Sequence, residues 1–254
     1  MDLTAFGLAT RVFGRSIHHF DEVASTNDVA ANFAQAGAEE GAVALATRQT
    51  QGRGRQSRRW ESPSGGLWMS IVLRPKICSE ELPGLTLVIA TAVAQALQHL
   101  ASVPARVRWP NDVYVADKKI AGLLAEARWS GDHPEFCCVG LGLNVNVDRS
   151  DFSQDVAESA TSLQAVLGRE VAVEPLLVAL FERMEECYAA FCGGGFSALR
   201  AEVSQWCETL GREVKVREPD LNGRAMEIGP NGSLRVQTGE GLVDVWSCES
   251  IRLG

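Results

Sequence analysis

A segment rich in glycine and arginine, residues 49–60, constrains this chain more than any other part of the sequence. It reads Gln-Thr-Gln-Gly-Arg-Gly-Arg-Gln-Ser-Arg-Arg-Trp, with four arginines and two glycines. Glycine lets a backbone approach a ligand closely, and arginine donates paired hydrogen bonds to phosphate or carboxylate. Because like charges in one loop repel each other, we expect the loop to become ordered around an anion. A solvated basic loop and an RNA-contacting segment are the alternatives that the loop alone leaves open.

The charge of the whole chain bears on that choice. The 254 residues have a net charge of −8, with 46% hydrophobic and 22% charged residues. This composition is typical of a soluble globular protein with one large domain, or one domain and a small one. Proteins that bind nucleic acid usually have a basic balance or a basic face. The basic loop on an acidic chain therefore favours a small anionic ligand.

Cysteine and apolar residues indicate the compartment. The chain has seven cysteines without a Cys-x-x-Cys pair, and only four histidines, which argues for free thiols and against a zinc site. No apolar leader is visible at the N-terminus, and the longest apolar run, residues 85–97, is too short and too polar to span a bilayer. We expect a cytoplasmic protein that does not enter a membrane.

Residues 1–210 show the periodicities of both helices and strands. Ser25-Thr26-Asn27-Asp28 is expected to open a helix that Gly37 ends. Further helices are expected from Pro83 to Leu100 and over residues 162–167, 174–191 and 196–210, with Gly193-Gly194-Gly195 separating the last two. Strands are expected over residues 42–46, 67–73, 106–108, 113–115, 119–127 and 136–147.

The texture of the sequence changes at residue 211. Short alternating runs at residues 214–216, 225–228, 234–236 and 243–246 are separated by Asn222-Gly223, Asn231-Gly232 and Gly239-Glu240-Gly241. Asn-Gly pairs and short glycine-containing segments of this kind are typical of hairpin turns. We therefore predict two domains, residues 1–210 and a small β-barrel-like domain over residues 211–254.

Five short motifs occur in order along the chain. They are Ser25-Thr26-Asn27, Gln49 with Gly52-Arg53-Gly54-Arg55, Arg108-Trp109-Pro110-Asn111-Asp112, the stretch from Lys119 to Glu126, and the stretch from Gly140 to Asn146. Together they resemble the biotin protein ligases over roughly residues 20–254. One departure is Arg108, where the family commonly has lysine, so that charge is kept and geometry changes. Residues 1–20, which precede the first motif, leave no room for the DNA-binding module of the larger members, so we expect the short form, without DNA binding.

The resemblance implies a fold and a reaction. The fold is α+β, a mixed β-sheet flanked by helices, with a small C-terminal SH3-like β-barrel. The reaction uses ATP and Mg²⁺ to activate biotin as biotinyl-5′-AMP, and then transfers biotin to a lysine of a biotin carboxyl carrier protein, usually that of acetyl-CoA carboxylase. The sequence leaves monomer and homodimer open.

The resemblance also assigns roles to residues of this chain. The catalytic candidates are Lys119, Arg53 and Arg55, with Lys119 as the charge between the biotin carboxylate and the α-phosphate. The biotin site is expected from Ser25, Thr26, Asn27, Gln49, Arg53, Gly54, Arg55, Lys119, Gly122 and Leu124. The ATP site is expected from Arg55, Trp60, Arg108, Asn111, Asp112, Lys119 and Asn144, with Asp112 as the Mg²⁺ ligand.

Plainer readings exist for several of these residues. Ser25 to Asn27 can be helix caps, Trp60 can be a core residue, and Asn144 can be a turn residue after a strand. A lipoate or octanoate ligase or transferase of related fold is the nearest alternative function. A non-catalytic nucleic-acid-binding protein is the alternative from a different class.

Overall fold

A seven-stranded mixed sheet forms the centre of the protein. The computed structural model describes residues 7–248 and 250–253. The strand order is β1-β2-β3-β7-β6-β5-β4, in which β1 and β2 are parallel and the other neighbours are antiparallel. The strands are β1 (Ile17–Val23), β2 (Val43–Gln49), β3 (Leu67–Leu73), β4 (Arg106–Arg108), β5 (Asp112–Val115), β6 (Lys118–Ser130) and β7 (His133–Leu143). This confirms the predicted mixed sheet, although no strand was predicted over the residues of β1.

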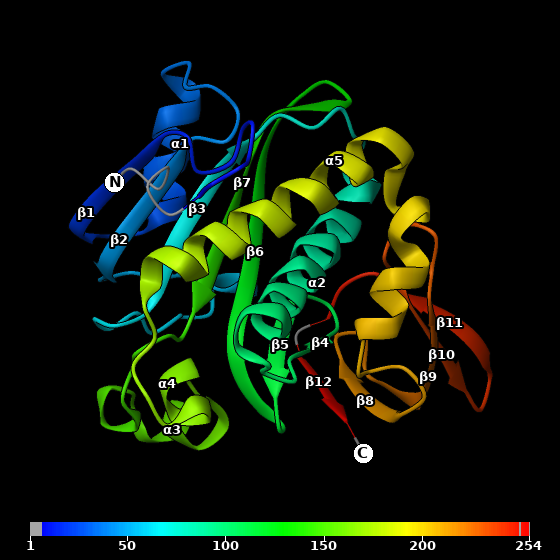
Figure 1. Cartoon of the computed structure of the whole chain (residues 1–254). Coiled ribbons are helices and arrows are strands. Elements are labelled where there is room, and N and C mark those ends of the chain that lie inside the picture. The colour runs from blue at the N-terminus through cyan, green and yellow to red at the C-terminus, as the bar shows by residue number, and fades with distance from the viewer. Residues whose placement is uncertain (1–6, 249, 254) are drawn as a thin grey trace.

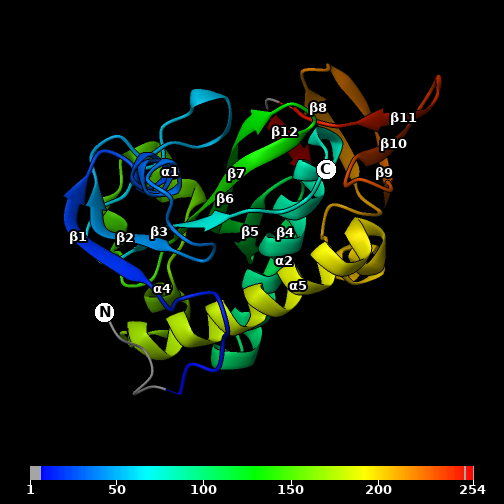
Figure 2. The same ribbon diagram turned by 90° about the horizontal axis from the view of Figure 1, so that it is seen from above.

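Helices cover both faces of this sheet (Figure 1, Figure 2). Helices α2 (Leu82–Ala101) and α5 (Val173–Trp206) pack on one face, and α1 (Thr26–Gln35) packs on the other. The division follows the alternation of side chains along a strand, because Val43 and Leu45 of β2 join the large core while Ala44 joins the small cluster under α1. Helix α1 lies over β2, β3 and β7, and its Phe33 ring contacts the rings of His18 and Phe20 on β1.

The most apolar helix lies inside the protein. Residues Ser79–Ala101 are long and apolar enough to cross a membrane by composition, and 72% of the apolar window is buried. Every residue from Gly84 to Leu97 is buried between the sheet and α5. Its apolar side chains therefore form the core.

The predicted break between two helices at Gly193-Gly194-Gly195 is confirmed as a kink of α5 at Gly195, where φ is +66°, whereas two predicted ends were wrong. Helix α5 stays helical through Gly193 and Gly194, and it ends at Trp206 and not at Leu210. Strand β7 ends at Leu143, so that Asn144 and Asn146 follow the strand. Helix α4 (Leu163–Leu167) was expected, whereas α3 (Gln154–Ser159) was missed.

The C-terminal residues form a second sheet of five antiparallel strands. Its order is β11-β10-β9-β8-β12, with β8 (Glu213–Arg217), β9 (Leu221–Ile228), β10 (Leu234–Thr238), β11 (Gly241–Val245) and β12 (Ser250–Leu253). Asn222-Gly223 lies inside β9 and pairs with β8, so its assignment as a turn was wrong, and β12 was missed. No pairing joins β11 to β12 among the described residues, so the element is an open sheet and the barrel is not seen to close. The domain division at residue 210 stays a prediction.

A close contact attaches this sheet to the rest of the protein. A Cβ added to Gly232 would lie 2.9 Å from the backbone of Gly84 at the start of α2. The buried indole of Trp109 donates to the carbonyl of Gly232 at 2.9 Å, and the Trp109 amide donates to the hydroxyl of Thr209 at 3.0 Å. The turn between β4 and β5, which carries Trp109, is thereby fixed to the C-terminal sheet.

This contact gives a prediction with a matched control. Gly232 and Gly211 both have positive φ, +89° and +80°, but nothing lies within 4 Å of a Cβ added to Gly211. Because alanine disfavours the left-handed backbone, each change to alanine should lower the free energy of unfolding by about 1–2 kcal/mol. Gly232→Ala should lose a further ~1–3 kcal/mol because the methyl group meets backbone. Equal losses for the two variants in urea unfolding would contradict the contact.

Candidate active site

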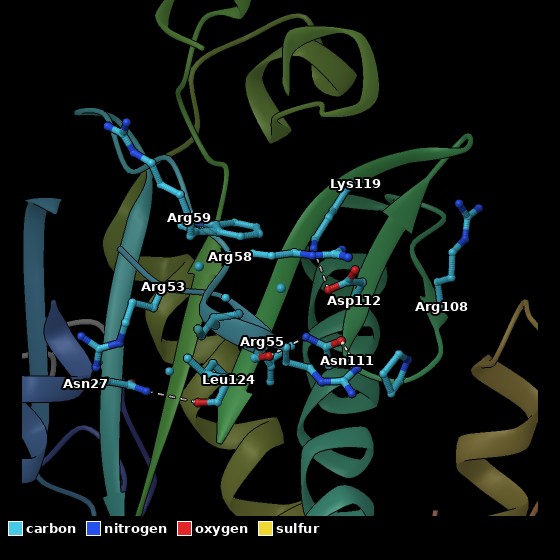
Figure 3. A pocket seen from close by; sticks show the side chains of 18 of the residues that line it. Asn27, Arg53, Arg55, Arg58, Arg59, Arg108, Asn111, Asp112, Lys119 and Leu124 are labelled. Atoms are coloured by element: carbon cyan, nitrogen blue, oxygen red, sulfur yellow. Dashed lines mark hydrogen bonds and ion pairs between the residues drawn. The ribbon is translucent and has the colours of Figure 1, made fainter. Parts of the chain in front are cut away.

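A cavity of about 370 Å³ lies on the same face of the large sheet as α1, over the part of that face that α1 does not cover (Figure 3). Its floor follows from strand register. Gly142 of β7 lies between Gly122 of β6 and Trp68 of β3, and Gly140 lies between Leu124 and Ser70. Since directly opposite residues share one face, three glycines open a hollow between larger neighbours.

The hollow is filled by side chains from outside the sheet. A Cβ on Gly140 would lie 2.5 Å from Oδ1 of Asn27. A Cβ on Gly142 would lie 2.5 Å from Nε1 of Trp60, and one on Gly122 would lie 2.8 Å from the same ring. The glycines therefore let Asn27 and Trp60 rest directly on the backbone, as expected for glycine within a strand. Trp60 is thus part of the cavity wall, and its ring also contacts Trp68 edge-on.

The glycine-arginine segment folds as an irregular hairpin between β2 and β3. The Trp60 amide donates to the Gly52 carbonyl at 2.9 Å, and the Gly54 amide donates to the Arg58 carbonyl at 2.7 Å. At the tip, Gln56 and Ser57 have φ of +54° and +57°, a strained conformation for residues other than glycine. The hairpin forms one side of the cavity.

One end of the cavity is lined by amide and hydroxyl groups. Oε1 of Gln49 accepts from the Thr26 amide at 2.8 Å and from the Thr26 hydroxyl at 3.1 Å. The Ser70 hydroxyl lies 2.7 Å from the Thr26 hydroxyl and 2.6 Å from Oδ1 of Asn27. Ser70 has one proton for two acceptors. Ser25 is the residue before α1 and makes no side-chain cap, so the capping explanation fails for it.

The other end is cationic. Nζ of Lys119, at the start of β6, lies 2.7 Å from Oδ1 of Asp112 and 5.0 Å from the ring centre of Trp60. Arg55 donates to Oδ1 of Asn111 at 3.4 Å and to the hydroxyl of Ser247 at 2.8 Å. Asn111 donates in turn to the Leu123 carbonyl at 2.7 Å, which holds it in place.

Charge is unevenly distributed around the cavity. Among the described residues, its lining has one carboxylate, Asp112, and seven cationic side chains: Arg53, Arg55, Arg58, Arg59, Arg108, Lys119 and Arg252. The whole chain is acidic, so this lining concentrates positive charge in one concave place. Such a cavity attracts and focuses anions.

Arg53 lines the cavity, but its charge is engaged elsewhere. Its guanidinium donates to both oxygens of Asp28, at 2.8 and 2.6 Å, and to Glu126 at 3.4 Å. The hydrogen bond from Arg53 lowers the pKa of Asp28, and the two carboxylates raise the pKa of Arg53. In Figure 3 Arg53 lies on the Asn27 side, across the cavity from Lys119 and Asp112. This geometry suits a structural role better than the catalytic one expected for Arg53.

Arg108 is similarly committed. Its guanidinium stacks 3.6 Å from the ring centre of Tyr114, and it bonds to Glu208, in the segment after α5, and to Asp117. Its side chain is only 14% exposed. Arg108 joins β4 to the segment after α5, and its role in holding ATP stays a prediction.

Asn144 does not line the cavity. It is buried, and its Nδ2 donates to the Thr161 carbonyl at 2.9 Å, while Oδ1 has no partner among the described residues. The other predicted site residues, namely Ser25, Thr26, Asn27, Gln49, Gly54, Arg55, Trp60, Asn111, Asp112, Lys119, Gly122 and Leu124, all line it.

Several lining residues were not assigned from the sequence. Arg58 and Arg59 stand in the glycine-arginine segment, and the glycines at 140 and 142 in β7 were noted without a role. Cys248, Ile251 and Arg252 lie in and just before β12. They follow the glycine-arginine segment by about 190 residues, and no local signal marks them. Burial raises the pKa of the Cys248 thiol, against the opposite effect of Arg55.

Comparison with known proteins gives the family. Residues 20–144 match the biotin/lipoate A/B protein ligase family. The bifunctional ligase/repressor BirA of Bacillus subtilis is 33% identical over 98% of this chain and 77% of its own length. A biotin–acetyl-CoA-carboxylase ligase of Paracoccus denitrificans is 33% identical over 77% of this chain and 80% of its own length.

Solved structures agree with this result. The biotin protein ligase of Aquifex aeolicus in complex with biotin and ATP superposes with a TM-score of 0.82 at 30% identity, over 94% of this chain and all of that one. The enzyme of Leishmania major in complex with biotin gives a TM-score of 0.63 at 25% identity, over 91% and 98% of the two chains. The chain therefore belongs to the biotin/lipoate A/B protein ligase family, and within it to the biotin protein ligases.

Proposed function

We propose that this chain is an ATP-dependent biotin protein ligase. In the first step a carboxylate oxygen of biotin attacks the α-phosphorus of ATP, which forms biotinyl-5′-AMP and releases pyrophosphate. In the second step a lysine amine of a carrier protein attacks the biotinyl carbonyl carbon, an amide bond forms, and AMP leaves. The observation that carries the proposal is a single cavity with an amide-lined end and a cationic end.

The amide-lined end suits the ureido ring of biotin. That ring has two N–H donors and one carbonyl acceptor in a rigid plane, and a site for it needs fixed polar groups in a largely apolar wall. Thr26, Asn27 and Gln49 supply such groups, and Leu124 with the floor glycines supplies the wall. Lipoate and octanoate have no donors or acceptors at that end, so buried polar groups there would lose their partners. This favours biotin.

The cationic end answers the difficulty of the first step, in which two anions must meet. Fixed positive groups stabilise the charge that develops as the carboxylate approaches the α-phosphate. Lys119 is held by Asp112 at 2.7 Å, and an incoming carboxylate or phosphate would compete with Asp112 for its ammonium group. Arg55 and Arg58 add charge from the hairpin.

A magnesium ion fits this end only as a companion of ATP. No cluster of three or more His, Cys, Asp or Glu residues that could hold a metal occurs among the described residues. Mg²⁺ is commonly held by one or two carboxylates together with substrate phosphates, which Asp112 and a bound triphosphate would provide. The ion would supply further positive charge at the phosphates.

Trp60 and the hairpin protect the mixed anhydride from water. The ring of Trp60 lies on the floor beside Lys119, where it excludes solvent from the reacting carbonyl. Exclusion of water from such an intermediate prevents its hydrolysis until the acceptor arrives.

The acceptor and the location belong to the same proposal. A biotin carboxyl carrier protein of an acetyl-CoA carboxylase is the acceptor that the Paracoccus denitrificans relative's name indicates. The seven cysteines are free thiols, in keeping with work in the reducing cytoplasm. If the chain dimerises, we propose that β1, at one edge of the large sheet, forms the interface, because β4 at the other edge is bridged to Cys207.

The substrate is tested by pyrophosphate release. With ATP and Mg²⁺, we expect release with biotin and none with lipoate or octanoate. Release should stop after one turnover until a carrier domain is added, because the adenylate stays bound. Release with lipoate instead would keep the chemistry and replace the substrate. No release with any of these acids would refute the enzyme assignment, and a salt-sensitive gel shift with nucleic acid would then test the remaining alternative.

Lys119→Ala should slow adenylate formation by roughly 10²–10³-fold, the usual effect of removing a group that stabilises transition-state charge. The Kd for biotin should change far less. Lys118→Ala is the matched control, since Lys118 is the exposed neighbour on the same strand. Single-turnover kinetics on folded protein, checked by its Tm, gives the rate. An adenylation rate near that of the wild type would remove Lys119 from its role.

Gly142→Ala should weaken biotin binding by roughly tenfold or more, because the added methyl group overpacks the floor. The new Cβ would lie 2.5 Å from Nε1 of Trp60 and force the ring off the strand. Gly239→Ala is the control, since nothing lies within 4 Å of its Cβ. Calorimetric titration with biotin measures both, and an unchanged affinity for Gly142→Ala would show that the ring does not bound the site.

A further inference from the structure

The pairing of Arg53 needs an explanation of its own. Arg53 is one of four arginines in the hairpin, yet its guanidinium turns to two carboxylates, Asp28 in the first turn of α1 and Glu126 in β6. Neither acid lines the cavity. The guanidinium therefore lies on the Asn27 side of the cavity, away from the cationic end at Lys119 (Figure 3).

The geometry of this pair is favourable. Both terminal nitrogens of Arg53 donate to Asp28, at 2.8 and 2.6 Å, and the fork of a guanidinium matches a carboxylate in this arrangement. The side chains of Arg53 and Asp28 are 35% and 52% exposed, so water screens the pair substantially and its strength rests on the bidentate geometry. Glu126 adds a second carboxylate at 3.4 Å.

Glu126 also connects the pair to the ligand site. Its Oε2 accepts from Nδ2 of Asn27 at 2.5 Å, while Oδ1 of Asn27 receives the hydroxyl of Ser70. Asn27 lines the amide end of the cavity. One carboxylate therefore holds both Arg53 and a residue of the proposed biotin site.

The backbone carries the restraint from Arg53 to the wall of the cavity. Arg53 is bridged to Arg59, and its neighbours Gly52 and Gly54 bond to Trp60 and Arg58 across the hairpin. A Cβ on Gly52 would lie 2.5 Å from the Trp60 carbonyl, so the two strands of the hairpin are in close contact. Fixing the side chain of Arg53 thereby fixes Trp60 over the floor.

We propose that Asp28 and Glu126 are positioning residues that hold Arg53, and with it the glycine-arginine hairpin and Trp60, closed over the cavity. For its ligand the inference rests on the proposed function, and for the hairpin it does not. Opening the hairpin breaks the contacts of Arg53 with both acids. Asp28 and Glu126 therefore set how readily biotin and its adenylate leave, and they take no part in the chemical step.

Trypsin tests the hairpin directly, without any ligand. It cleaves after arginine, and Arg55, Arg58 and Arg59 all lie in the segment that the pair holds down. Asp28→Asn and Glu126→Gln keep the shape of each side chain and remove its charge. We expect the double variant to be cleaved roughly five- to tenfold faster at these three arginines, as suits a partly exposed charged hydrogen-bonded pair.

Two controls accompany this measurement. Glu22→Gln removes an exposed ion pair with Arg48 at 3.5 Å on β1 and β2 and should leave cleavage unchanged. Cleavage after Arg183 and Arg200 in α5, read by mass spectrometry in the same digests, reports global unfolding. Hairpin cleavage at the wild-type rate would overturn the proposal, as would an increase matched at Arg183 and Arg200.

Kinetics then separates positioning from catalysis. The double variant should raise the KM for biotin and release biotinyl-5′-AMP faster, by roughly the same factor as the cleavage rate, with kcat for adenylation unchanged. The single variant Asp28→Glu, which keeps the charge, should retain most of the wild-type affinity for biotin. A fall in kcat at unchanged KM would overturn the positioning role. If wild-type protein does not turn over biotin, the proposed function fails, and the cleavage rates still decide whether the two acids hold the hairpin.

Discussion

The alternation of side chains between the two faces of the large sheet is the constraint on which the site depends. On one face of β6 and β7, the alternate residues Ala121, Leu123, Leu141 and Leu143 join the main core. On the opposite face, glycines leave the surface of the sheet shallow. Because side chains alternate, the large residues of these strands point into the core and the glycines lie on the opposite face. The same stretch of sequence therefore specifies both the packed core and the hollow of the cavity. A register slip of one residue would exchange them.

The arginines of the hairpin have different charged and polar partners. Arg53 is neutralised by acids on α1 and β6, whereas Arg55 faces Asn111 and the C-terminal sheet. Identical residues two positions apart thus have different environments because a hairpin turns them to different sides. The charge available to a ligand is therefore smaller than a count of arginines suggests, and it is concentrated near Lys119.

The sequence was sufficient for most of the large sheet, because strand periodicity and turn residues act locally. The cavity lining near its motifs was predicted through the resemblance to the biotin protein ligases. It was insufficient where long-range packing decides. Strand β1 has exposed polar residues on a sheet edge and a weak apolar pattern. Gly193 and Gly194 stay helical between flanking residues that are buried in the core, Phe191 and Phe196. Neither Arg252 nor the pairing of Arg53 with Asp28 could be predicted, since each depends on which distant segments meet. Asn144 was placed in the site from its motif, yet the turn after β7 buries it beside Thr161.

Arg55 bonds to Ser247 in the segment that leads to β12, and Trp109 fixes the opposite side of the C-terminal sheet to the turn before Asp112. The hydrogen bond from Arg55 to Ser247 thus joins the hairpin to the segment before β12. A ligand that favours the closed hairpin therefore also favours this contact, and loss of the contact weakens the ligand by the same free energy. This reciprocity is a property of linked equilibria and needs no movement of the large sheet between them.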